Sequence, residues 1–488
     1  MRSTTVPGLV EKLAEQGHLI GSQWVKSSSG GIHPHVYAAT GRVQAEVGLG
    51  GAADVDLAVD AARKAQPTWA ALSPGKRAAI LFALADLLDD HRLEAAELAA
   101  LDTGAPVSVM NPGRYTASWV RYYAGWADKL SGDSWSEGRR RVDVRLEPYG
   151  VIGVLPPWNG SMMGMGQKCA PALAAGNTVV VKPPEIAPFG MLRFCELALE
   201  AGVPEGVINV VVGNAEAGEA LAGHPRIDKI SFTGGIATAR TIMATAARNL
   251  TPVALELGGK SPNLVFQDAD LDTAADMAAL GGTALLSGQG CALPTRTYVQ
   301  EDVYEDVVRR ILARLATLRV GDPLDPETFV GPVVTRAAME RILGVIELAR
   351  SQGATLLTGG ARMRGDLADG WFVAPTVFGD VDHDSDLARN EVFGPVHAVL
   401  RFKSEEEVLE KANDSEFGLA AYVHTTDASR IERLVGELEA GTVVVNGLGG
   451  ISPTTPFGGY KRSGFGREGG RAGIEEMVRT KSVIVHGR

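Results

Sequence analysis

The first 150 residues of the chain show two different spacings of apolar side chains. Through residues 53–103, apolar positions recur at helical spacing, which predicts amphipathic helix. Pro74 and Gly75 interrupt this pattern and predict a break in the helix. From Arg139 to Glu147, charged residues alternate with valine and leucine, a period of two that predicts a strand with one wet face.

Between residues 150 and 270, short β-branched runs alternate with helical stretches. The predicted strands span 151–155, 179–181, 207–212, 230–232 and 253–257, and the predicted helices include 186–201 and 236–249. Such alternation predicts parallel strands joined by right-handed helical crossovers, which form a doubly wound sheet. A second α/β region follows from residue 263 to about 460, with predicted strands at 264–266, 297–300 and 442–446 and a helix near 303–318.

The C-terminal tail carries a further strand pattern at residues 481–485, beyond the second region. Neither this tail nor the charged strand at 139–149 has an obvious partner in the two predicted sheets. Because an unpaired strand edge invites another chain, we expect these segments to pair across a subunit interface. The patterning as a whole predicts an α/β protein.

Composition and charge narrow the class of protein. With 488 residues, 45% of them hydrophobic and 22% charged, the chain is long enough for two or three soluble domains. Its formal net charge of −11 argues against a nucleic-acid partner or an anionic membrane, because both favour a basic face. No run of about 18 apolar residues predicts a membrane span, and no secretory signal is visible, so a cytoplasmic location is expected.

Three cysteines are too few and too scattered for a disulfide framework, which favours a reducing compartment. They also lack zinc-ligand spacing, so no metal site is expected. Cys169 and Cys195 lie in apolar helical stretches and are expected to be small buried hydrophobes. Cys291 instead follows Gly288 and Gly290, which predict a tight turn open to a ligand. As a thiolate in an electropositive site, Cys291 could attack a carbonyl carbon.

Two polar residues near the ends of apolar strands could assist such an attack. Glu256 lies in the strand at 253–257, where burial would raise its pKa and suit a general base. A capping or salt-bridged carboxylate would fit the same pattern. Asn159 follows the strand at 151–155, and its amide could hold a developing oxyanion or simply satisfy the loop backbone.

Other residues near strand ends could bind a dinucleotide. Lys182 and Glu185 follow the strand at 179–181, at the edge of an open α/β sheet where ligands bind, although a solvated strand-end pair would look the same. Two pairs of glycines could approach a pyrophosphate, yet neither completes the G-x-G-x-x-G fingerprint: Gly213 with Gly218, and Gly234 with Gly235.

In this order, these segments resemble the aldehyde dehydrogenase superfamily over nearly the whole chain. The matching segments are 157–159, 182–185, 232–234, 256–262, 288–291, 391–395 and 456–464. Their common order along the chain makes chance an implausible explanation. The resemblance implies two Rossmann-like, doubly wound α/β domains, one dinucleotide-binding and one catalytic, with a small β oligomerisation element. It also implies an NAD-dependent, hydrolytic enzyme that oxidises an aldehyde to the carboxylic acid.

The resemblance implies a role for each catalytic residue. Cys291 would attack the aldehyde to give a thiohemiacetal, and hydride transfer to the nicotinamide would leave a thioester. The Asn159 amide and the backbone N–H of Cys291 would hold the oxyanion. Glu256 would activate the water that releases the acid, and Lys168 would belong to the same catalytic group.

NAD is the cofactor that the resemblance implies. The implied cofactor-binding residues are Pro157, Trp158, Lys182, Pro184, Glu185, Gly213, Gly218, Phe232, Thr233, Gly234, Gly235, Leu257, Glu391 and Phe393. Glu185 can accept both hydroxyls of the adenosine ribose and would repel a 2′-phosphate by charge. NAD is therefore expected to be preferred over NADP, without being the exclusive cofactor.

The implied domains are discontinuous in sequence. Residues 1–129 and 150–257 would form the dinucleotide-binding domain, residues 258–469 the catalytic domain, and residues 130–149 and 470–488 the oligomerisation element. The oligomerisation element implies a homodimer or homotetramer. The remaining partner would be a small-molecule aldehyde.

The residues after Asn159 depart from relatives that carry an aromatic residue there. The expected substrate pocket comprises Gly160, Gly164, Gln167, Gly290 and Ala292. The first two glycines would remove side-chain volume, and the neighbouring methionines would leave a deformable apolar wall. We therefore expect a bulky apolar aldehyde, unless residues 447–455 refill the space.

Three other functions stay open at this point. A CoA-acylating relative would pass the acyl group to a thiol, but such relatives commonly lack a carboxylate at the position of Glu256. A non-catalytic structural homologue would not need Cys291, Glu256 and Asn159 together. A cysteine amidohydrolase would need a histidine or lysine base beside Cys291 and would leave the cofactor motifs without a purpose.

Overall fold

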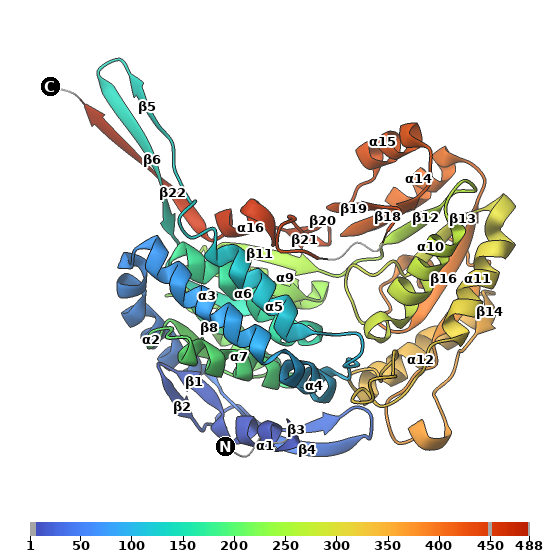
Figure 1. The fold of residues 1–488 in the computed structure, drawn as a ribbon, viewed down its shortest axis with the longest axis horizontal. Coiled ribbons are helices and arrows are strands. Elements are labelled where there is room, and N and C mark those ends of the chain that lie inside the picture. The colour runs from blue at the N-terminus through green and yellow to red at the C-terminus, as the bar shows by residue number, and fades with distance from the viewer. Residues whose placement is uncertain (1–5, 448–450, 487–488) are drawn as a thin grey trace.

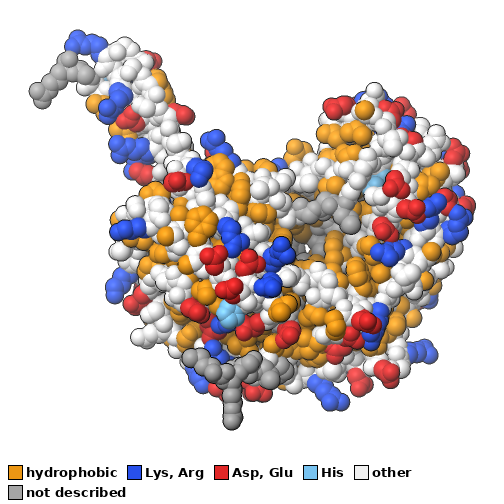
Figure 2. All heavy atoms as spheres, in the orientation of Figure 1, with side chains coloured by type: hydrophobic (Ala, Val, Ile, Leu, Met, Phe, Trp, Pro, Cys, Tyr) orange, Lys and Arg blue, Asp and Glu red, His pale blue; other side chains and the backbone are white. Residues whose placement is uncertain are grey.

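The computed structural model of the chain describes residues 6–447 and 451–486. Residues 1–5 of the predicted dinucleotide-binding segment, 448–450 of the predicted pocket loop and 487–488 of the predicted oligomerisation tail lie outside the described residues. Two α/β bodies lie side by side, and a narrow β arm projects from the first of them (Figure 1). The face shown in Figure 2 is hollowed between the two bodies, and acidic and basic side chains are interspersed over it.

The first sheet has eight strands in the order β2-β1-β9-β8-β7-β10-β11-β21. Their bounds are β1 His18–Ile20, β2 Gln23–Val25, β7 Val151–Leu155, β8 Thr178–Val181, β9 Ile208–Val210, β10 Lys229–Gly234, β11 Val253–Leu257 and β21 Gly464–Phe465. Five neighbouring strands of this sheet, β9, β8, β7, β10 and β11, pair in parallel, as the alternation of strands and helices predicts. Since the strand order runs outward from β7 in both directions, the topological switch point lies between β7 and β10.

Helices cover both faces of this sheet. One face carries α1 Val6–Gln16, α3 Pro74–Asp90, α4 Arg92–Thr103, α5 Pro112–Ala124, α6 Met162–Ala175 and α7 Phe189–Glu200, and the other carries α2 Ala52–Ala71, α8 Ala215–Ala222 and α9 Ile236–Ala247. Val179 and Val181 of β8 pack into the first layer and Val180 into the second, because successive strand side chains point to opposite faces. The predicted helical stretch 53–103 is three helices, and one of its breaks falls at Pro74 as expected.

The second sheet has seven strands in the order β14-β15-β16-β13-β12-β18-β19, and only β14 runs antiparallel to its neighbour. Their bounds are β12 Pro262–Val265, β13 Arg296–Gln300, β14 Thr355–Thr358, β15 Thr376–Gly379, β16 Val396–Phe402, β18 Ala420–His424 and β19 Thr442–Val445. One face packs on α10 Leu271–Asp276, the π-helical segment Met277–Ala284 and α11 Tyr304–Ala316, and the other on α12 Arg336–Ser351, α13 Asp386–Arg389, α14 Glu405–Asn413 and α15 Ala428–Glu437. The predicted pair of doubly wound α/β bodies is thus confirmed.

The projecting arm is a three-stranded sheet in the order β22-β6-β5. Its strands are β5 Ser134–Glu137, β6 Arg140–Pro148 and β22 Val478–His486. β22 pairs with β6 along its whole length, so the two strands that have no partner in the large sheets pair with each other within one chain. Trp135 and Ile484 stay about half exposed on the arm, which leaves apolar surface for a further contact.

The smaller elements connect these bodies. They are the hairpin of β3 Gly31–Tyr37 with β4 Arg42–Leu49, the pair β17 Phe417–Gly418 with β20 Tyr460–Lys461, and α16 Gly470–Glu475. Among residues 6–447 and 451–486, no helix is both long enough and apolar enough to cross a bilayer.

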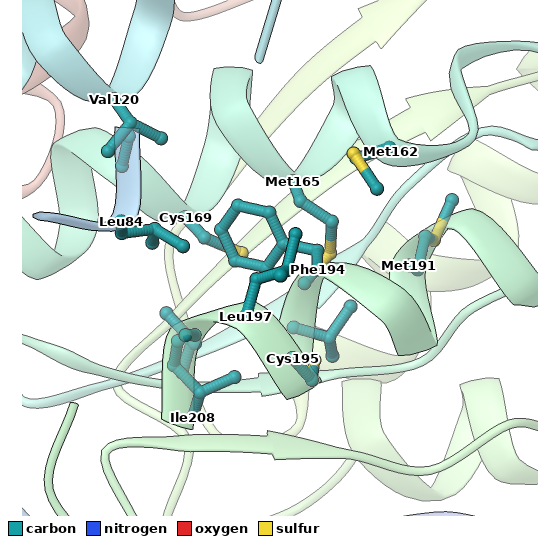
Figure 3. Close-up of a cluster of buried hydrophobic side chains, with 14 of the residues drawn as sticks. Leu84, Val120, Met162, Met165, Cys169, Met191, Phe194, Cys195, Leu197 and Ile208 are labelled. Carbon is teal, nitrogen blue, oxygen red and sulfur yellow. The ribbon is translucent and has the colours of Figure 1, made fainter. Parts of the chain in front are cut away.

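The core between α5, α6 and α7 contains methionines that the sequence places in a pocket wall. Figure 3 shows Met162 and Met165 among Cys169, Phe194 and other buried apolar side chains. Met162 is 1% and Met165 0% exposed, so neither can line a substrate pocket. The expected methionine wall is therefore wrong for these two residues, whereas the expected burial of Cys169 is confirmed.

Shortening Met165 should destabilise the fold, because it leaves a cavity among well-packed side chains. We expect Met165→Ala to lower the free energy of unfolding by about 2–5 kcal/mol in a denaturant titration. Met243→Ala, at a residue 42% exposed on α9, should change it by no more than about 0.5 kcal/mol. Equal losses in the two variants would contradict the placement of Met165 in the core.

Candidate functional site

The site lies where the chain crosses from the first sheet to the second. β11 ends at Leu257 and β12 begins at Pro262, so the glycines between them connect the two bodies. A Cβ added to Gly259 would stand 2.6 Å from the carbonyl oxygen of Cys291. The two motifs at 256–260 and 288–291, separate in sequence, therefore pack against each other.

The turn that presents Cys291 has a left-handed backbone. Leu286 and Ser287 have φ of 51° and 53°, and Gly288 has φ of 70°. The Ser287 hydroxyl donates to the carbonyl of Gly331 at 2.8 Å and anchors the turn. A Cβ at Gly288 would overlap the carbonyl of Gly394, so the close approach there requires glycine.

The groups around the Cys291 thiol are acidic rather than basic. Burial, together with the charges of Glu391 and Glu256, raises the pKa of Cys291 to about 12. The protein groups around Cys291 therefore do not supply the electropositive site that a thiolate was expected to have. A thiolate here needs a base or a bound cation to form at neutral pH.

Asn159 is held beside the Cys291 turn. It lies on the short 3₁₀ helix η1, Trp158–Gly160, directly after β7. Its Nδ2 donates to the carbonyl of Gln289 at 2.8 Å, which leaves its second N–H free for a ligand. Gln289 is fixed in turn, because its Oε1 accepts the N–H of Val334 at 3.0 Å.

Glu256 is a buried carboxylate without a hydrogen-bond partner. It is 5% exposed, and neither side-chain oxygen is bonded. Burial, and next the charge of Glu468, hold the pKa of Glu256 well above its usual range. A Cβ at Gly458 would lie 2.8 Å from Oε1, so a glycine covers the carboxylate closely. This environment is the one predicted for a general base.

Lys168 is hydrogen-bonded to Glu468, the residue whose charge raises the pKa of Glu256. Its Nζ donates to Glu468 Oε1 at 2.5 Å and to the Ser231 hydroxyl at 3.2 Å. Sequence reasoning included Lys168 but missed Glu468. A carboxylate inside the glycine-rich run 464–470, just after the last matching motif, is the signal that could have found it.

A pocket of about 380 Å³ opens between α8 and α9, at the ends of β7, β8 and β10. Three predicted cofactor residues line it: Lys182, Gly218 and Phe232. Its other walls are largely apolar and include Leu155 and Ile242, which suits a flat aromatic base. The pocket is therefore a candidate for the adenosine half of a dinucleotide.

Lys182, which lines this pocket, contacts other predicted cofactor-binding residues. Lys182 Nζ donates to the carbonyl of Gly213 at 3.0 Å, and Gly213 bridges to Pro184. Burial lowers the pKa of Lys182, while the charge of Glu185 opposes that shift.

The glycines after β10 differ in their surroundings. The Phe232 ring folds over Gly234, where a Cβ would overlap it, and Thr233 is half-buried between them. A Cβ at Gly235 would meet nothing within 4 Å, and α9 begins directly after it. Helix N–H groups that face open space can receive a phosphate.

The motif at residues 391–395 also contacts the segment that joins β11 to β12. The Glu391 carboxylate accepts the N–H of Gly259 at 3.1 Å, and burial raises the pKa of Glu391 to about 7. The Phe393 ring lies edge-on to Trp158, with 5.6 Å between ring centroids. Leu257 is buried, and its N–H donates to the Ser463 carbonyl at 3.0 Å.

Four of the five predicted pocket residues have packing roles. Cβ atoms at Gly160 and Gly164 would meet Pro157 at 3.4 Å and Pro156 at 3.2 Å, so these glycines do not widen a pocket, which corrects that expectation. A Cβ at Gly290 would press on Leu293, and the Ala292 carbonyl accepts the Tyr422 hydroxyl at 2.9 Å. Only Gln167 presents a polar side chain, and its Nε2 donates to the Tyr115 hydroxyl at 3.1 Å.

Three residues near Cys291 or its neighbours were missed entirely. Burial raises the pKa of both Tyr115 and Tyr422, and the charge of Cys291 adds to each shift. The Tyr422 hydroxyl also donates to the carbonyl of Ala292, the residue after Cys291. The two tyrosines come from α5 and β18, far apart in sequence and within no motif. Lys260 Nζ is fully buried without a hydrogen-bond partner, and burial lowers the pKa of Lys260 to about 7.

The chain matches known proteins over nearly its whole length. A family model described as the aldehyde dehydrogenase family matches residues 24–483. Betaine aldehyde dehydrogenases of Rhizobium leguminosarum bv. trifolii and Rhizobium etli are 40% and 41% identical over 471 residues, which are 96% of each chain. A solved betaine aldehyde dehydrogenase from Staphylococcus aureus, in complex with NAD⁺, is 35% identical with a TM-score of 0.95, over 99% of this chain and 97% of that one. The chain therefore belongs to the aldehyde dehydrogenase family.

Proposed function

We propose that this chain is an NAD-dependent aldehyde dehydrogenase that oxidises its substrate to the carboxylic acid through a thioester on Cys291. The observation that carries this proposal is the meeting of three groups beside one crossing between sheets. They are the thiol of Cys291, the free amide N–H of Asn159 and the unpaired carboxylate of Glu256. Nucleophile, oxyanion donor and base are the parts that covalent catalysis on a carbonyl needs.

The residues present fit NAD, which the solved Staphylococcus aureus relative contains. The pocket between α8 and α9 would take the adenine, with Lys182 and Glu185 at its ribose. The open N-terminus of α9 at Gly235 would face the pyrophosphate, and Glu391 the second ribose. When bound, NAD supplies the hydride acceptor and a cationic ring.

Each protein group has one chemical task in this proposal. Cys291 forms the bond to the aldehyde carbon, and the Asn159 N–H stabilises the oxyanion, a contribution of about 3 kcal/mol in comparable sites. Glu256 takes the proton of the water that hydrolyses the thioester, since its raised pKa suits a base. Glu468, bonded to Lys168, keeps a negative charge beside Glu256 and so helps hold that pKa high.

The pocket wall supports an aldehyde with an apolar body. Met163 and Gln167 are half-buried on one face of α6, which begins shortly after Asn159, and the Tyr422 hydroxyl donates to the carbonyl of Ala292, the residue after Cys291. No arginine or lysine lies on that face to pair with a substrate carboxylate. The bulky apolar aldehyde thus remains our proposal, resting on this wall rather than on the glycines. The arm of β5, β6 and β22 supports assembly into a dimer or tetramer. We also propose the predicted domain division, with the difference that β21, from the catalytic segment, pairs with β11 in the first sheet.

Removing the thiol should abolish oxidation. We expect Cys291→Ala to lower NADH formation from benzaldehyde by more than about 1000-fold, because no covalent intermediate can form. Cys195→Ala, at a cysteine buried in the core, should keep the activity and serves as the matched control. Retained activity in Cys291→Ala, or none in the wild-type protein with a panel of aldehydes, would contradict the proposed function.

Removing the base should stop the reaction after the first step. We expect Glu256→Gln to release a burst of about one NADH per site and then turn over about 100-fold more slowly. In the wild-type protein, the steady rate should fall as the pH falls through the raised pKa of Glu256, because only the carboxylate is a base. A stopped-flow pH series would show whether Glu256→Gln lacks that limb. An acyl-CoA product in the presence of CoA would instead favour the acylating alternative.

Removing the charge of Glu185 should relax the choice of coenzyme. Repulsion between this carboxylate and a 2′-phosphate amounts to about 1–4 kcal/mol per charge pair at about 4 Å. We therefore expect Glu185→Gln to raise the ratio of kcat/KM for NADP over NAD by about tenfold or more. Glu200→Gln, at the exposed end of α7, should leave the ratio unchanged. An unchanged ratio in Glu185→Gln would remove Glu185 from the ribose site.

A further inference from the structure

The peptide group between Gly258 and Gly259 is held at both of its ends by side chains from other segments. Its carbonyl, that of Gly258, accepts the Ser463 hydroxyl at 2.7 Å. Its N–H, that of Gly259, donates to the Glu391 carboxylate at 3.1 Å. Because a peptide group is planar, the two hydrogen bonds together fix one rotation of the whole group.

This peptide group would rotate easily without such restraint. It lies beyond β11, which ends at Leu257, and glycine on each side allows backbone angles that other residues resist. A half-turn would point the carbonyl oxygen of Gly258 at the Glu391 carboxylate and take the N–H of Gly259 away from it. The Ser463 hydroxyl opposes that rotation, because it bonds the carbonyl in the observed direction.

Ser463 is anchored by its own backbone. Its carbonyl accepts the N–H of Leu257 at 3.0 Å, and its N–H donates to the Tyr460 carbonyl at 3.0 Å. The hydroxyl, on a residue 0% exposed, accepts the N–H of Gly418 at 3.0 Å, so its one hydrogen is directed to Gly258. Loss of the hydroxyl therefore leaves the turn in place and removes the restraint on the peptide group.

The N–H of Gly259 also affects the charge of Glu391. Burial raises the pKa of Glu391 to about 7, and this N–H is the largest of the influences that lower it, ahead of the charges of Lys260 and Arg341. Without the N–H, the carboxyl group would keep its proton to a higher pH and would lose a bond that orients it. A protonated or turned carboxyl group accepts ribose hydroxyls less well.

We infer that Ser463 is a positioning residue for the cofactor: its hydroxyl holds the peptide group so that the N–H of Gly259 orients Glu391 toward the ribose beside the nicotinamide. This inference rests on the proposed function, in which Glu391 faces that second ribose. Ser463 acts through the peptide group and does not touch NAD itself. Its effect is confined to the nicotinamide half, because the pocket proposed for the adenosine half lies between α8 and α9.

The test separates the two halves of the cofactor by equilibrium binding. NAD carries both riboses, whereas ADP carries only the adenosine ribose and the pyrophosphate. We expect Ser463→Ala to raise the Kd for NAD about tenfold in isothermal titration calorimetry, the effect of one hydrogen bond to a charged group, and to leave the Kd for ADP unchanged. Ser463→Cys, whose thiol is a weaker donor, should give an intermediate Kd for NAD, and it replaces Ser463→Ala should that variant fail to fold.

Thr376 provides a matched control in the second sheet. Its hydroxyl is on a fully buried residue, donates to the Ala374 carbonyl at 2.7 Å and accepts the N–H of Gly360 at 2.8 Å. Thr376→Val removes the same kind of bond pair and should leave both Kd values unchanged. An equal rise for NAD and ADP in the Ser463 variants, or no rise in either, would overturn the inference. Absence of NAD binding to the wild-type protein would overturn the proposed function instead.

Discussion

Burial of negative charge at the crossing between the two sheets is the constraint on which the site depends. Glu256 and Glu391 both lose hydration there, and burial is the main cause of the raised pKa in each. The glycines at 258 and 259 make this possible, since a Cβ on Gly258 would overlap the Glu391 carboxylate. Without that close approach, the Glu391 carboxylate could not accept the N–H of Gly259. The fold brings them together by joining β11 directly to β12.

The same burial makes the free site a poor one for a thiolate. The pKa of Cys291 is raised to about 12 by burial and by the two carboxylates. Lys260, the buried cation next along the chain, itself has a pKa lowered to about 7 and so offers little compensating charge. A positive charge brought by the bound cofactor would therefore lower the pKa of the Cys291 thiol. Thiolate formation is in this way coupled to cofactor binding.

Local sequence patterns predicted the helices and strands but not the contacts between distant segments. The strand ending at Leu257 and the break at Pro74 were readable because β-branched runs and proline act within a few residues. The resemblance placed residues 130–149 and 470–488 in one element, but no local pattern paired β22 with β6, because the two strands are over 300 residues apart and a period-two pattern does not specify its partner. In the site, the motif residues were found, but Glu468, Tyr115 and Tyr422 were not. Their proximity to Cys291 is a property of packing and not of any local pattern.

Helix α6 shows why a sequence motif can identify catalytic residues without identifying the substrate. Its buried face, with Met162, Met165 and Cys169, is constrained by the core, and any change in volume there acts first on stability. The glycines at 160 and 164 belong to that constraint too, because prolines after β7 pack against them. Of the residues of α6, only Met163 and Gln167, one turn apart, are not fully buried. Substitutions at these two positions should therefore disturb the core less than substitutions on the buried face.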